Sequence, residues 1–352
     1  MDFTPTEEQA AAVDLAARIL GDHSTHERLT AAGTGSDAGL WKELCAAGLV
    51  GAVADTGLLG LVLLLEEQGR VTAQVPFAAS CVYGLLAVAA HGSPEQRERL
   101  LPGIADGTVV VTGAISGAQA LSASPPPSAS PAVSGTLTGV LPAVPWLRDA
   151  THVLVADERR GLWLVRVAEA AASEPVELTA PWSAGRLTLE GTPGEALGAA
   201  GAYDDLLATA RTAFAGLQAG VCAGSLARAV EHTNTREQFG QPLAARQGVQ
   251  LRAADAYMDT EAIRVTAYEA AWRRDEGLPY AAHALTAAWW ASEAGRRVVH
   301  TGQHLHGGAG ADLGHPVHRH FLWGRQLDAY LGCGGELLQE LGELIANGEV
   351  GT

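Results

Sequence analysis

Lysine is nearly absent from this sequence: Lys42 is the only one, and every other basic residue is an arginine. Acidic residues outnumber basic residues by 39 to 23, which gives a formal net charge of −16. Proteins bind nucleic acids and anionic membranes through a basic face. We therefore expect neither a nucleic acid nor a membrane as a partner.

Cysteine is also scarce, and its four copies are Cys45, Cys81, Cys222 and Cys333. No two of them form a CxxC pair, and this spacing is typical of reduced, buried thiols in a cytoplasmic protein. The N-terminus lacks a basic segment followed by an apolar core, so we expect no signal peptide. The longest strongly apolar run, residues 57–65, has nine residues; it is too short to span a bilayer and predicts a core helix.

A length of 352 residues with 47% apolar content predicts two or three domains with a sizeable core. Residues 1–107 have helical signals, among them Thr4 or Thr6 as an N-cap and Ser93 as a second one before Pro94. Helical patterns return in residues 201–352, where three or four long helices with short connections predict an antiparallel bundle.

Residues 108–200 have a different pattern, with short β-branched or alternating runs separated by Gly, Pro and Asp. This pattern predicts a small antiparallel barrel or sandwich. The low-complexity run at residues 122–134 cannot contribute to a core, and we expect it to form a mobile loop.

Half of the twelve histidines lie in the stretch 300–320, which raises the question of a metal site. His300 and His304 are four residues apart, as in the HExxH motif of zinc proteases. That motif needs a Glu after its first His, where this chain has Thr301, and no carboxylate or cysteine follows at ligand spacing before Asp312. The sequence therefore does not predict a metal site.

The segment "TREQFGQPLAARQ", residues 235–247, resembles the R-x-x-F-G-x-P-[LI] signature of the acyl-CoA dehydrogenase family, which is followed by Gln. The opening "MDFTPTEEQ" and the stretch "HLHGGAG" resemble two further motifs of that family. Together with the helical, β, helical order, the resemblance covers nearly the whole chain. It implies an N-terminal helical domain (1–107), a small antiparallel β-barrel (108–200) and a C-terminal antiparallel four-helix bundle (201–352).

The resemblance also implies FAD bound at a subunit interface. Arg236, Gln238 and Phe239 would reach the pyrophosphate and adenine end of a flavin whose ring lies in the neighbouring subunit. Arg246 and Gln247 match the next contact pair. A guanidinium suits this role because it can bond a phosphate through two donors.

The "HLHGGAG" stretch resembles the family's Q-x-x-G-G-x-G turn, with His304 at the position of the Gln. Gly307 and Gly308 would allow a positive φ and a close approach of the backbone to the adenosine. The histidine cluster is therefore interpreted as a turn at the edge of the cofactor. The last three histidines of the stretch 300–320 are expected to be partly exposed: His315, His318 and His320.

The glutamate with which family members remove the substrate's α-proton is missing from both of its known places. In the run after "PVHR", its position holds Leu331. The alternative place, just before an arginine on the first long C-terminal helix, corresponds to Ala210 before Arg211. Neither side chain can accept a proton.

The residues that would cradle the flavin ring are degraded as well. The family's T-E-P run corresponds to Ser116, Gly117 and Ala118, and only Trp146 keeps the aromatic character of its W-I-T/S run. The chain therefore resembles the non-catalytic subunit of actinobacterial steroid side-chain acyl-CoA dehydrogenases, which are α2β2 assemblies. The homologous catalytic subunit would hold the acyl-CoA, and an electron-transfer flavoprotein or similar acceptor would take the electrons.

Two alternatives remain open. The first is an active homo-oligomer with a relocated base, such as Asp328 or Glu336. The second is a non-redox protein that uses the fold to bind acyl-CoA or to act as a scaffold.

Overall fold

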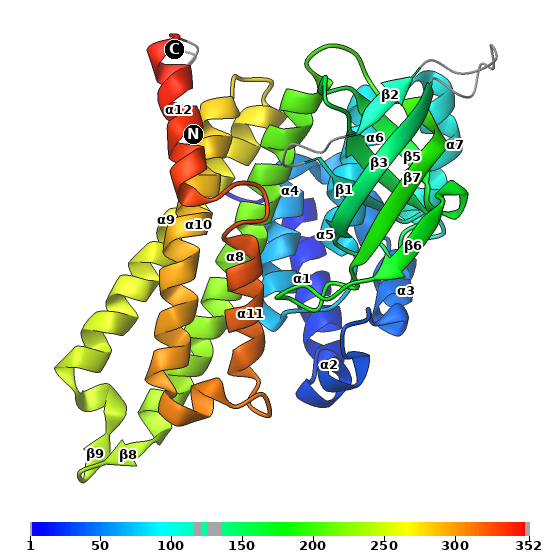
Figure 1. Ribbon diagram of the computed structural model, residues 1–352. Helices are drawn as coiled ribbons and strands as arrows, with labels where there is room; N and C mark the ends of the chain where they lie inside the picture. Colours follow the sequence, from blue (N-terminus) through cyan, green and yellow to red (C-terminus); the bar gives the residue numbers. More distant parts are fainter. Residues whose placement is uncertain (1, 116–120, 125–134, 349–352) are drawn as a thin grey trace. The chain divides into compact units, whose positions relative to one another are not determined.

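The computed structural model describes residues 2–115, 121–124 and 135–348 (Figure 1). Within these ranges the chain divides into two compact units. Unit 1 combines residues 1–26, 58–73 and 211–352, and unit 2 combines residues 27–57 and 74–210.

The helices of unit 2 are short. They are α2 (His26–Ala32), α3 (Ala38–Ala46), the first part of α4 (Leu49–Val71), α5 (Phe77–Ala79), the π-helix η1 (Ser80–Leu86), α6 (Ala87–His91) and α7 (Pro94–Ala105). The predicted start of α7 is confirmed, because the Ser93 side chain accepts from the backbone N–H of Gln96. The Gln96 side chain in turn accepts from the N–H of Ser93, which completes a capping box.

Unit 2 also contains a seven-stranded sheet in the order β1-β4-β5-β7-β3-β2, with β6 paired to β7. The strands are β1 (Val111–Ala114), β2 (Ser122–Ser124), β3 (Gly135–Val144), β4 (His152–Ala156), β5 (Leu162–Arg166), β6 (Ala172–Pro175) and β7 (Gly185–Ala196); a 3-10 turn, η2 (Val167–Glu169), follows β5. Alternate residues of β3, including Leu137, are buried in the sheet's apolar core, as a period of two requires.

The β domain is confirmed, with two corrections. All pairs are antiparallel except β1–β4, which is parallel, so the expectation of a wholly antiparallel sheet was wrong. Residues 122–124, expected in a mobile loop, form β2 and pair with residues 136–138 of β3. The remainder of that predicted loop, residues 125–134, lies outside the described residues.

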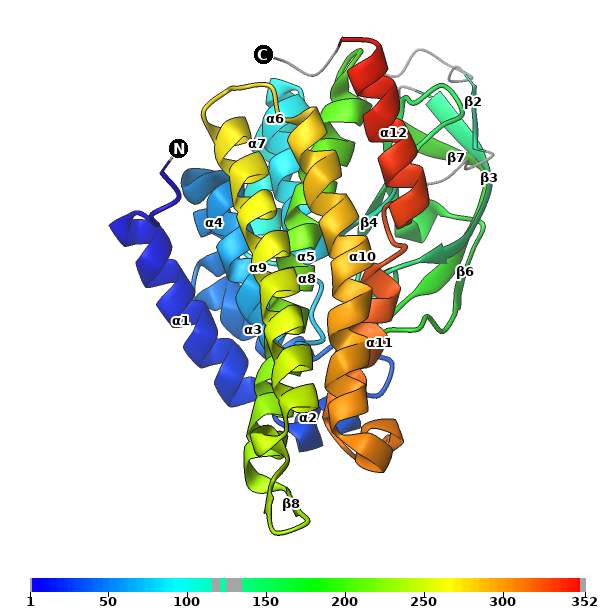
Figure 2. The ribbon, with the colours of Figure 1, turned by 90° about the vertical axis from the view of Figure 1, so that its left-hand side faces the viewer.

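Unit 1 is helical, and Figure 2 shows two of its long helices, α9 and α10, running side by side. Its helices are α1 (Glu7–His23), the second part of α4, α8 (Ala202–Thr235) from Arg211 onward, α9 (Gln247–Asp275), α10 (Ala281–Leu305), α11 (Val317–Leu327) and α12 (Gly334–Ala346). Thr6 caps α1 in a capping box with Gln9, so Thr6 and not Thr4 is the N-cap.

Helix α8 contacts the second part of α4 through three glycines spaced four residues apart: Gly216, Gly220 and Gly224. A methyl group added at Gly220 would lie 2.1 Å from the carbonyl oxygen of Glu66, and one at Gly224 would lie 2.2 Å from that of Arg70. The two helix backbones are therefore in direct contact along this stripe. Glycine is required there because any Cβ would force the helices apart.

Helix α4 changes direction at Gly57, whose φ of 72° and ψ of −166° suit only glycine. The helix restarts at Leu58, where the backbone N–H groups would lack partners. The Asp275 carboxylate accepts from the N–H of Leu58 at 2.8 Å and from that of Leu59 at 2.9 Å. The end of α9 thus caps the second part of α4.

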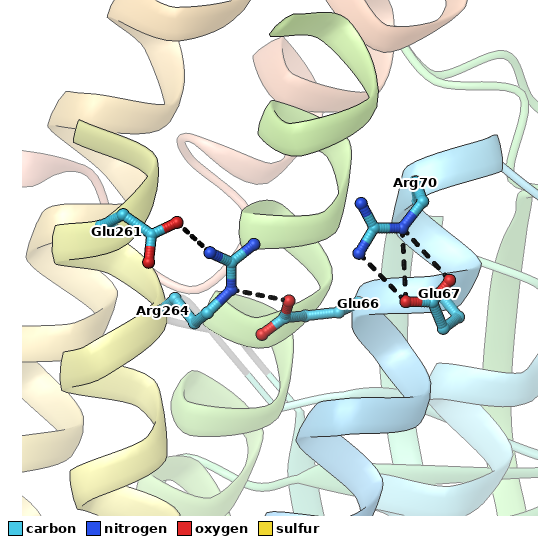
Figure 3. Close-up of polar contacts among 5 residues, drawn as sticks. All are labelled: Glu66, Glu67, Arg70, Glu261 and Arg264. Carbon is cyan, nitrogen blue, oxygen red and sulfur yellow. Dashed lines mark hydrogen bonds and ion pairs between the residues drawn. The ribbon is translucent and has the colours of Figure 1, made fainter. Parts of the chain in front are cut away.

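A buried ion pair connects the same two helices (Figure 3). The Arg264 guanidinium donates to the Glu66 carboxylate at 2.9 Å and also pairs with Glu261, one turn earlier on α9. Burial raises the pKa of Glu66 despite the neighbouring Arg264, and its side chain is only 6% exposed. Figure 3 also shows the separate pair of Glu67 and Arg70, both on α4.

Within the part of the chain that the structure describes, two helices could cross a membrane by length and composition: α4 and α8. Within their most apolar windows, however, 67% and 72% of the residues are buried in the protein. Burial of this extent is typical of core helices, which pass the same test. The nine-residue apolar run lies within α4, as expected for a core helix.

Two expected exposures were wrong. His320 is 1% exposed, and its ring Nε2 donates to the Arg70 carbonyl at 2.9 Å, so burial of the imidazole costs no hydrogen bond at that atom. Cys333 is exposed because it is the N-cap of α12, whereas Cys45, Cys81 and Cys222 are buried as expected.

Candidate functional site

The signature motif lies on a two-stranded hairpin between α8 and α9 (Figure 1). Strands β8 (Glu237–Gln238) and β9 (Gln241–Pro242) are joined by Phe239 and Gly240, whose φ angles are 56° and 79°. Two consecutive positive φ angles are the mark of a type I′ turn. The turn leaves the Phe239 side chain 90% exposed, so this ring is not a core anchor of its own chain.

Arg246 fixes the outer face of this hairpin. Its guanidinium lies 5.0 Å from the centre of the Phe239 ring, and Nη2 donates to the Gln238 carbonyl at 3.1 Å. Arg246 is also the N-cap residue of α9, and Gln247 is the first residue of that helix. The structure therefore groups four of the predicted contacts on one exposed tip.

A second group of predicted residues lines a pocket of about 580 Å³ at the base of the hairpin. It is lined by His232, Arg236, Leu243, Val249, His304, Leu305, His306, Gly307, Gly308 and Ala309. Arg236 comes from the segment after α8, and the glycines come from the 3-10 turn η4 (Gly307–Ala311) after α10. Arg236 and Gly307, 71 positions apart in the sequence (307 − 236), thus meet at one site.

Two glycines of η4, Gly307 and Gly308, have open space beside them. A methyl group added at Gly307 or Gly308 would meet no other atom within 4 Å, which leaves room for a ligand. The expected positive φ is confirmed at Gly307, at 60°, and is not found at Gly308. The neighbouring Gln303 does not take the role of the family's Gln in place of His304, because its side-chain amide donates to the Gly310 carbonyl.

The histidine-rich stretch forms no evident metal centre. Across residues 2–115, 121–124 and 135–348, no three His, Cys, Asp or Glu side chains are grouped so that they could hold a metal ion. His300 instead contacts Arg325 at 3.2 Å, and His304 is exposed at the rim of the pocket. His304 also borders a neighbouring pocket of about 630 Å³ along α9 and α10.

The position of the missing base is closed. Leu331 is 7% exposed and borders a cavity of only about 20 Å³. The Arg211 guanidinium fills the adjoining space: Nε donates to the Leu331 carbonyl at 3.3 Å, and two further nitrogens bind the Glu340 carboxylate at 2.7 and 2.8 Å. Phe214 and Tyr330 meet edge to face beside it, with ring centres 4.8 Å apart.

None of the other positions considered for the base places a carboxylate in the cavity beside Leu331. Ala210, at the alternative position, is fully buried. Glu336 accepts from the Cys333 N–H as part of a capping box, and these bonds lower its pKa. Asp328 is paired with Arg325 at 3.2 Å, although burial raises its pKa. Neither carboxylate lines the cavity beside Leu331.

In unit 2, Trp146 is fully buried and stacked on Trp182, with ring centres 4.5 Å apart and an angle of 16°. Its ring is therefore occupied by a neighbour within its own chain. The positions matched to T-E-P, Ser116, Gly117 and Ala118, lie outside the described residues.

The order of helical, β and helical regions and the hairpin motif define the fold of an acyl-CoA dehydrogenase. Residues 6–108 match the family profile described as "Acyl-CoA dehydrogenase, N-terminal domain", and residues 201–342 match "Acyl-CoA dehydrogenase, C-terminal domain". The chain belongs to the acyl-CoA dehydrogenase family, whose members are FAD-dependent flavoproteins. The resemblance seen in the sequence is thereby confirmed.

Several relatives are similar over almost their entire length. "Acyl-CoA dehydrogenase FadE27" of Mycobacterium tuberculosis is 33% identical over 374 residues, which cover 98% of this chain and 99% of that protein. The solved structure "Tcur3481-Tcur3483 steroid ACAD G363A variant" is 40% identical with a TM-score of 0.90. The ChsE4–ChsE5 complex from Mycobacterium tuberculosis is 30% identical with a TM-score of 0.91. Both structures cover 98% of this chain, which covers 99% of theirs.

Two of the titratable residues that line the pocket were not predicted as site residues: His232 and His306. His232 lies four residues before Arg236, which follows directly on the end of α8 and whose N–H still donates to the His232 carbonyl, so this spacing brings both side chains to the same side. That spacing was visible in the sequence and could have identified His232. His306 lies beside Gly307 in the motif and was discussed only as part of the cluster.

Proposed function

We propose that this chain is the non-catalytic subunit of a heteromeric acyl-CoA dehydrogenase and completes the FAD site of a homologous catalytic partner. The observation that carries the proposal is the closed base position. A general base must lie within hydrogen-bond reach of the proton that it removes. Here the Leu331 side chain offers no acceptor, and Arg211, which is paired with Glu340, lines the small cavity beside it.

The residues proposed to serve a partner's flavin lie close together, which supports the proposal. Arg236, His304, Gly307 and Gly308 line one pocket, and Phe239 and Arg246 form an exposed tip beside it. Cationic and open-backbone groups suit the pyrophosphate and adenosine end of FAD. The buried Trp146–Trp182 stack does not suit a flavin ring, because Trp146 has no free face toward it.

FAD, when bound in such a complex, would accept the hydride from the β-carbon of the acyl-CoA. The residues of this chain would hold and orient the far end of the cofactor. The catalytic subunit would supply the glutamate, the flavin cradle and the acyl pocket, and an electron-transfer flavoprotein or similar acceptor would reoxidise the flavin. An α2β2 assembly in the cytoplasm fits this division of roles.

For the substrate we propose a steroid side-chain CoA ester. The support is the similarity to a structure described as a steroid ACAD, at 40% identity over nearly the full length. The similarity to the ChsE4–ChsE5 complex supports the proposed heteromeric assembly.

The FAD content of the purified complex tests the proposal. We expect one FAD per heterodimer when the chain is co-expressed with its partner, and little yellow protein when it is expressed alone. Two FAD per heterodimer, measured by absorbance after denaturation, would show that this chain holds a complete flavin site. Full FAD occupancy of the chain alone would instead favour an active homo-oligomer.

The variant Arg236→Ala tests the shared site. The loss of a charge-assisted hydrogen bond to phosphate costs on the order of 1.5–3 kcal/mol, or roughly ten- to a hundredfold in FAD affinity. Arg18→Ala, at an exposed position on α1, is the matched control and should leave the affinity unchanged. Equal FAD retention by both variants under dilution would contradict the shared-site proposal.

A further inference from the structure

The pocket at the base of the hairpin is unusual in charge for so acidic a protein. Four of its ten lining residues are arginine or histidine, and none is a carboxylate. The chain as a whole has a net charge of −16. A local concentration of cationic groups in a cleft attracts anions.

The cationic character extends beyond the pocket along one face of α8. Arg228 and His232 are four residues apart on α8, so their side chains lie on one face of the helix, and Arg236 follows four residues later, directly after the helix ends at Thr235. Burial lowers the pKa of Arg228. Two carboxylates lie near these cationic groups: Glu231 acts to raise the pKa of Arg228, and Asp312 acts to raise that of the nearby His315. Neither carboxylate lines the pocket.

Three imidazoles lie close together beside this face. The rings of His232 and His306 are stacked, with ring centres 4.6 Å apart and an angle of 24°, and the ring of His315 lies 4.9 Å from that of His306 at an angle of 60°. His306 Nδ1 contacts the Gly302 carbonyl at 2.7 Å. A carbonyl only accepts, so this nitrogen carries the hydrogen, and Nε2 is the position at which His306 could bind a further group.

The surroundings disfavour the protonated form of His232 while the pocket has no anion. Burial, the neighbouring His306 and Arg236 together lower the pKa of His232. Burial and the imidazoles of His306 and His232 likewise lower the pKa of His315, together with Arg228 and against the opposing effect of Asp312. An anion placed among these groups would raise the pKa of both histidines, because a nearby negative charge favours the protonated imidazole.

We propose that His232, stacked on His306 beside Arg236, is a phosphate ligand that takes up a proton when a pyrophosphate group binds in this pocket. The inference rests on the proposed function, since the pyrophosphate in question belongs to the partner's FAD. It adds to Arg236 a second, titratable contact, and it makes retention of the cofactor dependent on pH.

The sign of this dependence follows from linkage. Between the lower pKa of His232 in the free pocket and its higher pKa in the bound pocket, FAD binding takes up a proton. The affinity for FAD therefore falls as the pH rises through that interval, by up to about tenfold per pH unit. The pyrophosphate diester of FAD does not itself titrate near neutral pH, so the slope reports on the protein.

The test uses the complex of this chain with its catalytic partner and FAD as the probe. Calorimetric titrations of the FAD-depleted complex between pH 6 and 8, in two buffers of different protonation enthalpy, give both the affinity and the protons taken up per FAD. We expect net proton uptake in the wild type. It should be lost in His232→Gln, which keeps a polar side chain that does not titrate.

His283→Gln is the matched control. This residue lies at the start of α10, paired with Glu269 at 3.3 Å and roughly 30 Å along the helix from His304. The control should retain the full proton uptake and pH slope. Absence of proton uptake in the wild type, or uptake that persists in His232→Gln, would overturn the proposal. A loss of affinity in His232→Gln that is equal at every pH would also overturn it, since that result indicates packing alone.

The variant Arg236→Ala separates this inference from the proposed function. If it releases FAD while the wild type shows no proton uptake, the shared site stands and only the role of His232 fails. If it retains FAD with wild-type affinity, the shared site itself fails, and the role of His232 fails with it.

Discussion

The contact between α4 and α8 leads to a quantitative prediction for Gly220→Ala. The new methyl group would lie 2.1 Å from the Glu66 carbonyl oxygen and 2.7 Å from its carbonyl carbon and Cα. Ordinary contact begins at 3.4 Å, so the shortest distance must grow by 1.3 Å (3.4 − 2.1). All three neighbours are backbone atoms, and no side chain can rotate away to relieve the clash.

The expected loss of stability follows from these distances. Overpacking a core costs typically about 1–3 kcal/mol, and a clash with rigid backbone belongs at the upper end. Alanine regains about 1 kcal/mol over glycine in a helix interior. The net expectation is a decrease of about 2 kcal/mol in the free energy of unfolding. Gly216→Ala should cost less, since the nearest atom there is a methyl carbon of Val62 at 2.7 Å.

Urea denaturation followed by circular dichroism at 222 nm measures the effect. Gly342→Ala is the matched control, because Gly342 is an exposed helical residue of α12 with no atom within 4 Å of the added methyl group. This control should unfold at the wild-type urea concentration or above it. If Gly220→Ala did the same, the inference of direct backbone contact between α4 and α8 would be wrong.

Three further predictions concern buried groups. Leu331→Glu should give no second active site, so turnover per heterodimer should not rise, because the adjoining cavity is only about 20 Å³ and no flavin is expected on this side. Arg264→Met should lower the free energy of unfolding by about 3 kcal/mol by leaving Glu66 buried without its partner, and adding Glu66→Leu should restore most of the loss. Burial lowers the pKa of His320 to about 4 from an ordinary 6.5, so the folded chain binds this proton less readily than the unfolded chain. Stability should therefore fall by up to about 3 kcal/mol as the pH decreases from about 6.5 to 4.

Each of these has a direct check. Turnover gained on adding Leu331→Glu to a complex whose partner base is mutated would refute the first. Equal stability of the single and double variants would refute the second. For the third, His320→Gln should lose much of the acid sensitivity seen in urea titrations at several pH values, and an unchanged pH profile would contradict the assignment.

The helical regions and the family could be predicted because their signals are local. Thr6 and Ser93 cap the helices that follow them through side chains only three residues away. Strand β6 was missed because all four of its residues are exposed and show no alternation. The parallel pairing of β1 with β4 joins residues 41 positions apart, and no local pattern encodes such a choice of partner.

The candidate site was predictable in part for the same reason. The hairpin motif is contiguous, so Arg236 and Phe239 could be found by inspection. The burial of His320 depends on the Arg70 carbonyl, 250 residues away, and the stack of His232 on His306 depends on the packing of α8 against the end of α10. The closure of the base position by Arg211 and Glu340 likewise joins residues 129 apart.

The exposed Phe239 has a consequence for how the protein must be produced in the cell. A phenylalanine ring at the tip of a two-residue turn, 90% exposed, contacts the Arg246 guanidinium but lies outside the core of its own chain. Copies of the chain made in excess would present this ring to any other apolar surface that they meet, including one another's. Under the proposed function, a partner subunit would cover the ring. Synthesis of the two chains in equal amounts, for example from one operon, would therefore avoid this unwanted association.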